Sequence, residues 1–467
     1  MYQIDFSKPC HIHFIGIGGI SMSALAELLF KRGFTVSGSD LRPSPLTERL
    51  AKMGITIYYE QTAKNITNDI AFAIYTAAVH SDNEEFCAAE QAKIPLLERA
   101  QLLGQITKQY VHAACVSGTH GKTSTTSMLS MILLQAKLDP TIVGGGVLDA
   151  IGGNLHIGQS DYFITEACEY TNSFLKFHPT DIIITNIEAE HLDFFKDLDD
   201  IRHSFSRFAS LLPENGALIM QGDIENIEEI RNTAPASCTF FTYGIETAGK
   251  IYDYTASNIS FDKQGYPSYD LLANGEIITR ISLQVIGEHN IQNSLAASAL
   301  ALHYGVQPED IVTALGDYHG TRRRFEYRGM VQGVSIYDDY AHHPTEIKAT
   351  LQAASHCTYH ELWCVFQPHT YSRTRAFLPE FAQALSLADH IIVTDIYSAR
   401  EDDPGDISSV QLAEKLKELG KDVIHISSFA EIEAHIKQNT VADDIVIVMG
   451  AGDVISISNS LTKPVCI

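Results

Sequence analysis

The sequence predicts an α/β protein of three domains, in which N- and C-terminal Rossmann-like parallel sheets flank a central P-loop-type domain with a small antiparallel sheet. Three observations predict this fold. The 467 residues correspond to about three domains of ordinary size. A short β-rich run, a glycine turn and a helical pattern follow one another three times, which is typical of parallel sheets covered by helices. A stretch rich in β-branched and aromatic residues interrupts this alternation at residues 239–286.

The first unit begins with a buried strand over residues 11–15, which leads into the turn Gly16-Ile17-Gly18-Gly19. A helix over 22–30 and a strand over 35–40 complete a βαβ unit. Ser21 stands where the dinucleotide fingerprint has its third glycine, and Asp40 stands where an acid binds ribose. A nicotinamide dinucleotide, another phosphate-bearing nucleotide and a turn without ligand therefore remain open. A nicotinamide-dependent dehydrogenase is one alternative function.

The second unit carries the strongest motif, a strand that runs into a glycine loop and then into a helix opened by Lys122 and Thr123. Glycines let backbone N–H groups approach phosphate oxygens, a lysine neutralises their charge, and a helix N-terminus favours an anion. The Thr123 hydroxyl suits Mg²⁺ that bridges two phosphates. Val116 stands where the usual P-loop has its first glycine, so the loop is a compact variant. The motif predicts binding of a nucleoside triphosphate.

Acidic residues follow the next two predicted strands of this domain. Glu166 and Glu169 come after a strand over 162–165, and His191 lies shortly after a strand over 181–185. The carboxyl ends of parallel strands form the ligand-binding edge of an open sheet. A carboxylate and an imidazole at neighbouring strand ends would complete a magnesium site with Thr123, whereas solvated loop acids and a capping histidine are the structural alternative.

Turn signals divide residues 239–286 into short strands, which we expect to be antiparallel and attached to the middle domain. A helix over 290–304 returns the chain to that domain. The predicted domains are residues 1–106, 107–320 and 321–467. In the last of them, polar clusters follow the strands over 334–337 and 362–366. These clusters predict a crevice for a small anionic substrate, with histidines packed at a domain surface as the alternative.

The composition excludes several classes of protein. A formal net charge of −24 argues against a general nucleic-acid binder. No apolar run is long enough to span a bilayer, and the first residues lack the pattern of a signal peptide. The eight cysteines are scattered without a C-x-x-C pair, as expected for free thiols in a reducing compartment. We therefore expect a cytoplasmic protein, either a monomer or a homodimer, with no membrane or nucleic-acid partner.

Several motifs together resemble those of the Mur ligases, in the family's order and over nearly the whole chain. They are HFIGIGGISMSALAELL with SGSD, SGTHGKTSTT, TNIEAEHLD, GEHNIQNSLAA, DDYAHHPTE and QPHTYSRTR. The resemblance implies an ATP- and Mg²⁺-dependent ligase of peptidoglycan precursor synthesis. Its expected reaction joins L-alanine to the lactyl carboxylate of UDP-N-acetylmuramate through an acyl phosphate. A recycling ligase that attaches a tripeptide to the same acceptor shares these motifs and remains an alternative.

The resemblance also implies roles for individual residues. The expected UDP-sugar contacts are Gly16, Gly18, Gly19, Ser39, Asp40 and His191. The expected ATP contacts are Gly118, Thr119, His120, Gly121, Lys122, Thr123, Ser124, His289, Asn290, Arg324 and Asp338. The expected metal ligands are Thr123, Glu166 and His191, and the expected amino-acid contacts are Tyr340, His342 and Arg373. The expected catalytic residues are Lys122, Glu166, His191, His342 and Arg373.

The chain departs from the family pattern at two places. Thr370 stands where many Mur ligases carry an arginine, so recognition of the alanine carboxylate is expected to depend more on Arg373. Cys168 and Thr171-Asn172 replace the usual acidic and small residues, although Glu166 and Glu169 are kept. The carbamylated lysine of several Mur ligases has no clear counterpart, and we predict none.

Overall fold

The structure is a computed structural model that describes residues 2–76, 78–399 and 401–463. The chain divides into two compact units, which are described separately. The first contains Met1–Gly244, Gly249–Tyr254 and Ser294–Ile311. The second contains Ile245–Ala248, Thr255–Asn293 and Val312–Ile467. Among the described residues, no helix is both long enough and apolar enough to cross a bilayer.

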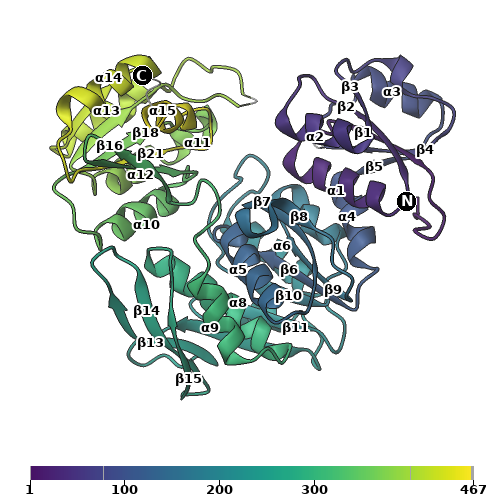
Figure 1. Cartoon of the computed structure of the whole chain (residues 1–467), viewed down its shortest axis with the longest axis horizontal. Helices are drawn as coiled ribbons and strands as arrows, with labels where there is room; N and C mark the ends of the chain where they lie inside the picture. Colours follow the sequence, from purple (N-terminus) through teal and green to yellow (C-terminus); the bar gives the residue numbers. More distant parts are fainter. Residues whose placement is uncertain (1, 77, 400, 464–467) are drawn as a thin grey trace. The chain divides into compact units, whose positions relative to one another are not determined.

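The first unit opens with a parallel sheet of strand order β3-β2-β1-β4-β5 (Figure 1). Its strands are β1 (His11–Ile15), β2 (Thr35–Ser39), β3 (Thr56–Tyr58), β4 (Ile70–Tyr75) and β5 (Leu96–Glu98). Its helices are α1 (Ile20–Lys31), α2 (Pro45–Met53), α3 (Glu84–Gln91) and α4 (Arg99–Thr107). The chain order β1-α1-β2 confirms the predicted βαβ unit, and β1 and β2 are paired in parallel from His11 and Thr35 onward.

Helix α2 shows how local sequence sets the ends of an element. Ser44 caps its first turn by accepting the N–H of Thr47, whose side chain accepts the Ser44 N–H in return. Pro45 supplies the φ angle that the first helical position needs. The helix ends at Gly54, whose φ of 105° lies in the left-handed region that glycine tolerates.

The first unit also holds the strands of a large mixed sheet, in the order β12-β11-β10-β6-β9-β7-β8. These are β6 (His112–Ser117), β7 (Thr141–Leu148), β8 (Gly153–His156), β9 (Tyr162–Glu166), β10 (Asp181–Ile184), β11 (Ala217–Gln221) and β12 (Thr239–Ile245). The helices α5 (Lys122–Gln135), α6 (Leu198–Ala209) and α7 (Ile227–Arg231) alternate with them. Strands β10 and β11 are buried along their whole length, as expected for parallel strands covered on both faces.

One prediction for the middle of the chain is wrong. The sequence predicts antiparallel strands over residues 239–286, but β12 pairs in parallel with β11, with Thr239 opposite Ala217. Helix α7 lies between the two strands in the chain and makes the crossover that a parallel pair needs. The expected antiparallel pairing holds for β14 (Pro267–Ala273) and β15 (Glu276–Ser282), which follow β13 (Tyr254–Phe261). Asn274 and Gly275, both with positive φ, form the tight turn between β14 and β15.

Helices α8 (Glu288–His303) and α9 (Pro308–Gly316) lead to the C-terminal sheet, which has the order β16-β17-β21-β18-β19-β20. Its strands are β16 (Glu326–Val331), β17 (Val334–Asp339), β18 (Leu362–Phe366), β19 (His390–Val393), β20 (Asp422–His425) and β21 (Ile445–Met449). In this sheet order, all neighbouring strands from β17 through β21, β18 and β19 to β20 are parallel, as predicted. Strand β16 was not foreseen, and it pairs antiparallel with β17 through a turn at Gln332 and Gly333, which both have positive φ.

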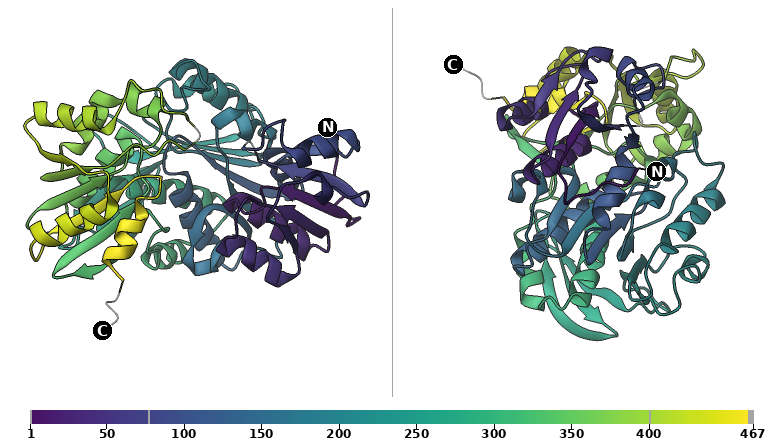
Figure 2. Two further views of the ribbon diagram at one scale, coloured as in Figure 1. Left: turned by 90° about the horizontal axis from the view of Figure 1, so that it is seen from above. Right: turned by 90° about the vertical axis from the view of Figure 1, so that its right-hand side faces the viewer.

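Helices cover both faces of this C-terminal sheet (Figure 2). They are α10 (Pro344–Ala354), α11 (Tyr371–Ala376), α12 (Leu378–Leu385), α13 (Ser409–Glu418), α14 (Phe429–Asn439) and α15 (Ile455–Leu461). One apolar core contains Leu351 of α10, Phe381 of α12 and Leu412 of α13. A second core contains Ile432 of α14 and Ile457 of α15. The two cores enclose the sheet, and residues that follow its strands are left to form a polar edge.

The described cysteines are free thiols, as predicted. Cys115 and Cys364 are buried, and burial raises the pKa of both above its ordinary value. Cys10, Cys87, Cys168, Cys238 and Cys357 are half-buried. Cys466 lies outside the described residues.

Candidate active site

The predicted phosphate loop joins the end of β6 to the start of α5. Gly118 and Gly121 both have positive φ, which turns the chain sharply between β6 and α5. The segment after β10 supports the loop: the Thr119 N–H donates to the Asn186 carbonyl (3.1 Å), and the His120 N–H donates to the Asn186 side-chain oxygen (2.8 Å). The loop is therefore preformed by contacts with the neighbouring strand end.

Lys122 is folded back over this loop. Its ammonium group donates to the carbonyls of Gly118 and Thr119, the latter at 3.0 Å, and forms an ion pair with Glu169 at 3.1 Å. Burial alone would lower the pKa of Lys122, but the charge of Glu169 raises it above its ordinary value. These contacts therefore hold the positively charged ammonium group of Lys122 next to the phosphate loop. A triphosphate would replace the loop carbonyls as its partner.

The pair predicted to bind magnesium is assembled directly beside the loop. The Thr123 hydroxyl donates to Oε2 of Glu166 at 3.1 Å, and the Gly145 N–H donates to Oε1 of the same carboxylate at 2.8 Å. A hydroxyl and a carboxylate are the oxygen ligands that Mg²⁺ prefers. The donor set therefore fits the ion, and Thr123 and Glu166 are the residues that would hold it.

His191, the third predicted metal ligand, lies in the segment after β10 with a φ of 55°. Its ring stacks on Tyr170 with a centroid distance of 4.4 Å, and Tyr170 is fixed by a hydrogen bond from its hydroxyl to Asp193 (2.7 Å). Thr171 and Asn172, which depart from the family pattern, also have positive φ, a conformation that asparagine tolerates better than most residues. The role of His191 as a ligand stays a prediction.

The N-terminal glycine loop is tied to the end of β2. The N–H groups of Gly16 and Ile17 donate to the Ser39 carbonyl at 2.9 and 2.8 Å. The N–H of Gly18 donates to Asp40 at 2.8 Å, and a Cβ at Gly18 would lie 2.6 Å from that carboxylate oxygen. Asp40 thus shapes the loop, and the Ser39 hydroxyl turns inward to donate to buried Glu85. Contact of these two residues with a UDP-sugar stays a prediction.

Arg99 contacts the helix that follows this loop, and sequence reasoning missed it. Its guanidinium donates to the Ser21 hydroxyl at the start of α1 (3.0 Å). Burial lowers the pKa of Arg99, while the nearby charge of Glu166 opposes that shift. Asn154 of β8 makes a second link, donating to the Ile20 carbonyl at 2.8 Å. The signal that Arg99 offered was its position directly after β5, at the edge where the other strand ends carry polar groups.

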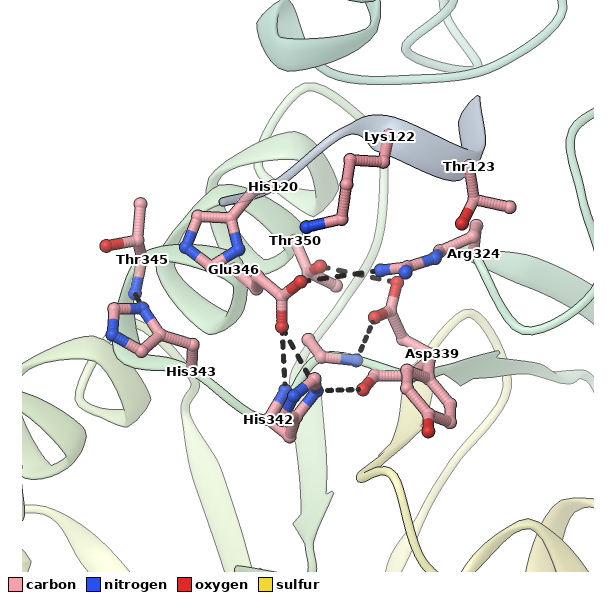
Figure 3. A network of polar contacts seen from close by, with 12 residues as sticks. His120, Lys122, Thr123, Arg324, Asp339, His342, His343, Thr345, Glu346 and Thr350 are labelled. Atoms are coloured by element: carbon pink, nitrogen blue, oxygen red, sulfur yellow. Dashed lines mark hydrogen bonds and ion pairs between the residues drawn. The ribbon is translucent and has the colours of Figure 1, made fainter. Parts of the chain in front are cut away.

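In the second unit, a polar network follows β17 (Figure 3). Glu346, in the first turn of α10, accepts from Arg324 (3.5 Å) and from the His342 N–H (3.1 Å), and lies 3.3 Å from His342 Nδ1. His342 Nδ1 is also 3.0 Å from the Tyr340 carbonyl. Contact of His342 with the amino acid, and its role as a base, stay predictions.

The second polar cluster follows β18 and lies beside the first. The ring of His369 is 5.6 Å from that of His342, and Arg373 donates to His369 Nδ1 at 3.0 Å. Thr370 caps α11 by accepting the Arg373 N–H at 3.3 Å. The structure therefore brings Tyr340, His342 and Arg373 into one neighbourhood, and gives Thr370 a structural task that an arginine side chain would not perform.

The remaining ATP candidates of the second unit fall into two groups. Asp338 is fully buried and accepts from Arg323 (3.2 Å) and Ser458 (3.4 Å). His289 and Asn290 lie at the start of α8, where the Asn290 side chain donates to the Ile286 carbonyl at 2.8 Å. Burial, together with the charge of Arg324, lowers the pKa of His289 to about 4, so the ring is neutral at physiological pH. Contact of these residues with ATP stays a prediction.

Comparison with known proteins agrees with this arrangement. The chain matches the models of the Mur ligase family catalytic domain over residues 11–111, the Mur ligase middle domain over 116–301 and the Mur ligase glutamate ligase domain over 323–452. The chain belongs to the Mur ligase family. It is 53% identical over 470 residues to the UDP-N-acetylmuramate–L-alanine ligase of Lachnoclostridium phytofermentans, covering 99% of this chain and 100% of that protein.

Other relatives extend the comparison. The UDP-N-acetylmuramate–L-alanine ligase of Lachnospira eligens is 51% identical, with 99% of this chain and 100% of that protein covered. A crystal structure of the UDP-N-acetylmuramate–alanine ligase of Thermotoga maritima superposes with a TM-score of 0.81 at 29% identity, covering 97% and 98% of the two chains. A murein peptide ligase of Psychrobacter arcticus superposes with a TM-score of 0.71 at 25% identity, covering 98% of this chain and 100% of that one.

In this Mur ligase, Gly145 of β7 is a second residue that sequence reasoning missed. A Cβ at this position would lie 2.5 to 2.7 Å from the carboxylate atoms of Glu166, so only glycine lets that side chain reach Thr123. We expect Gly145→Ala to raise the Mg²⁺ concentration needed for half-maximal rate by about 10- to 100-fold, as for other residues that orient a metal ligand. Magnesium titrations of the initial rate measure this shift.

Gly144→Ala is the matched control, because a Cβ there would approach no atom closer than 3.4 Å. Its magnesium dependence is expected to equal that of the unmodified enzyme. A Gly145→Ala enzyme with the same magnesium dependence as Gly144→Ala would show that Glu166 does not hold the ion.

Asp339 of the Mur ligase C-terminal domain is a buried carboxyl group. It accepts from the N–H groups of Phe325 (2.8 Å) and Ala341 (2.6 Å), and burial raises its pKa from 3.8 to about 6. The folded state then holds the proton of Asp339 more tightly than the unfolded chain does. The contribution of this group to the free energy of unfolding is therefore fully present at low pH. It is lost as the pH rises through 6.

In the unmodified protein, Asp339 should therefore lower the free energy of unfolding by about 2 to 3 kcal/mol as the pH rises from about 4 to about 6. Asp339→Asn has no titratable group at this position and should not show this decrease. Trp363, the single tryptophan, lies in the same sheet and reports urea unfolding of this domain by fluorescence. The measurement compares the pH dependence of the two proteins. Parallel curves for them would contradict the prediction.

Proposed function

We propose that this Mur ligase joins L-alanine to the lactyl carboxylate of UDP-N-acetylmuramate at the expense of ATP. The observation that carries the proposal is the loop of Lys122 placed directly beside the pair Thr123 and Glu166. Relatives that are 51% and 53% identical over the full chain are named UDP-N-acetylmuramate–L-alanine ligases. Together they support an ATP-dependent acid–amino-acid ligase of peptidoglycan precursor synthesis.

A carboxylate does not condense with an amine unaided, because an oxide ion is a very poor leaving group. ATP removes this obstacle in two steps. One carboxylate oxygen attacks the γ-phosphorus in line, the bond from that phosphorus to the β,γ-bridging oxygen breaks, and ADP leaves with an acyl phosphate formed. The alanine nitrogen then attacks the acyl carbon, and the tetrahedral intermediate expels inorganic phosphate. The amine proton passes to a base.

The residues divide this work between them. In the first unit, the N-terminal glycine loop would hold the UDP-sugar. The hydrogen bond from Asn154 to the Ile20 carbonyl joins the helix after that loop to the ATPase domain. Thr123 and Glu166 would hold Mg²⁺, which when bound neutralises phosphate charge. Lys122 stabilises the transferred phosphoryl group. In the second unit, Arg373 would hold the alanine carboxylate and His342 would accept the amine proton.

One observation favours an alternative function, the attachment of a peptide to UDP-N-acetylmuramate. The murein peptide ligase of Psychrobacter arcticus has the same fold over the full chain, with a TM-score of 0.71. A ligase that attaches a peptide to the same acceptor would share the ATP chemistry and differ at the amino-acid site. The lower identity of 25%, against 53% for an alanine ligase, favours alanine.

A phosphate-release assay tests the proposal. It contains ATP, Mg²⁺ and UDP-N-acetylmuramate, with a panel of L-alanine, glycine, L-serine and the tripeptide as amine donors. We expect release that requires all components and is fastest with L-alanine. Release that is fastest with the tripeptide would assign the recycling activity instead, and release that does not depend on the UDP-sugar would contradict both.

A further inference from the structure

The amino-terminal edge of the C-terminal sheet carries a second cluster of titratable side chains. Strands β21, β18, β19 and β20 are consecutive neighbours and parallel, so their first residues lie side by side. Asp444 directly precedes β21, His360 and Glu361 precede β18, His390 begins β19, and Asp422 begins β20. The active-site candidates of this domain follow the opposite, carboxyl ends of β17 and β18. The cluster therefore belongs to a separate place in the fold.

These side chains are connected in a row. His360 Nδ1 is 2.8 Å from Asp444 Oδ1, and His390 Nε2 is 3.0 Å from Glu361 Oε2. The other nitrogen of His390 is 2.6 Å from Asp422 Oδ2. Ligand atoms of His360, Glu361 and Asp444 all lie within 4.8 Å of one another.

Asp444 gives the cluster a rigid base. Its side chain is fully buried, and its two oxygens accept the N–H groups of Val441 (2.9 Å) and Glu361 (3.1 Å). His360 and Glu361, by contrast, are 57% and 42% exposed, so an ion can reach them. A cavity of about 290 Å³ adjoins the row and is lined by Glu361, Trp363, His390, Asp422 and His435 among others.

We propose that His360, Glu361 and Asp444 bind a divalent transition-metal ion of the zinc type, with His390 and Asp422 as positioning residues for Glu361. Zn²⁺ takes imidazole nitrogen and carboxylate oxygen at about 2.0 to 2.2 Å, which in a tetrahedron places the ligand atoms about 3.3 Å apart. His360 Nδ1 and Asp444 Oδ1 are 2.8 Å apart, and all three ligand atoms lie within 4.8 Å of one another. Rotation of the exposed His360 and Glu361 side chains would complete the site, with water as a fourth ligand.

Charge and hydrogen bonding support this choice of ion. Two carboxylates balance the charge of a divalent cation, and the imidazole favours zinc over magnesium, which prefers oxygen ligands. The row Asp422–His390–Glu361 matches the outer-shell arrangement in which a hydrogen-bonded partner fixes the orientation of a metal ligand.

The single tryptophan of the chain makes the site observable. The ring of Trp363 stacks on that of His390 with a centroid distance of 4.1 Å and an interplanar angle of 21°. Intrinsic tryptophan emission therefore comes from a side chain that touches the proposed site. Co²⁺, which occupies zinc sites and quenches nearby tryptophan, is the probe for this readout.

The experiment uses the full-length untagged protein in millimolar Mg²⁺, which fills sites made of oxygen alone. Zn²⁺ binding is measured by competition with a chromophoric chelator, and Co²⁺ binding by quenching of Trp363. We expect one zinc ion per chain at this site and saturable quenching by Co²⁺. His360→Ala and Glu361→Gln should each weaken both signals at least about tenfold, in the range known for loss of a metal ligand or its partner.

His425→Ala is the matched control, because His425 forms an ion pair with Asp395 (2.8 Å) in the same domain, away from the row. Its zinc affinity and cobalt quenching are expected to equal those of the unmodified protein. His360 is largely exposed, so its replacement leaves the core intact, and unchanged urea unfolding verifies this. Absence of zinc binding, or zinc binding that His360→Ala leaves unchanged, would overturn the proposal.

Discussion

Replacing Lys122 with alanine is expected to lower the rate of phosphoryl transfer about a thousandfold while leaving the KM for UDP-N-acetylmuramate nearly unchanged. The first step brings a carboxylate toward a polyanion, and two unit charges about 4 Å apart repel by about 4 kcal/mol at an effective dielectric constant of about 20. A barrier increase of that size corresponds to about three orders of magnitude in rate. ADP formation under single-turnover conditions measures the step directly.

The variant needs a control for the charge it leaves behind. Glu169 is only 2% exposed and would lose its cationic partner, which by itself destabilises a protein. The double variant Lys122→Met with Glu169→Gln removes both charges and should show the same rate loss with a normal melting temperature. Lys137→Ala, two residues beyond the end of α5, should retain full activity. A double variant that transfers the phosphoryl group at the normal rate would contradict the assignment of Lys122.

Replacing His342 with alanine is expected to affect the second step and spare the first. A positioned general base contributes about a hundredfold to ten-thousandfold, so formation of the amide with L-alanine should slow by at least about a hundredfold. Formation of the acyl phosphate, trapped by hydroxylamine in the absence of alanine, should continue at the normal rate. Comparison of the two rates in one preparation makes the measurement.

His342→Gln separates proton transfer from positioning. Glutamine can keep a hydrogen bond to Glu346 or to the Tyr340 carbonyl but cannot titrate near neutral pH. It should show the same slow second step and lose the acidic limb of the pH profile of the unmodified enzyme. Equal losses in hydroxamate and amide formation, or an unchanged pH profile, would show that His342 is not the base.

The sequence predicts the parts of this fold that depend on local pattern. A strand, a glycine turn and a helix opened by Lys122 identify the phosphate loop, because each feature follows from a few adjacent residues. The same reasoning places polar residues at strand ends, where Glu166, Tyr340 and Arg373 are found. The direction of β12 was missed because parallel or antiparallel pairing depends on a crossover helix of only five residues, α7. Strand β16 was missed because the turn that joins it to β17 lacks the Asn-Gly or Asp-Gly pair that typically marks a tight hairpin.

The parts of the site that escaped prediction depend on contacts between distant residues. Gly145 is 21 residues from Glu166, and nothing in its own surroundings shows that it lies against that carboxylate. Arg99 meets Ser21 across 78 residues. The ion pair between Lys122 and Glu169 also joins two separate elements. The motif therefore identifies the lysine, but it does not show that Glu169 is the partner of the lysine in the absence of ATP. Packing between distant parts of the chain sets these contacts, and the spacing of residues along the sequence does not reveal them.

The most direct test follows oxygen atoms through the reaction. UDP-N-acetylmuramate labelled with ¹⁸O in its lactyl carboxylate is converted with ATP and L-alanine, and the inorganic phosphate is analysed by mass spectrometry. If the phosphate loop directs the γ-phosphorus of ATP to that carboxylate, one ¹⁸O atom appears in each phosphate released. Unlabelled phosphate, with the isotope in AMP or retained in the amide product and water, would contradict activation by γ-phosphoryl transfer.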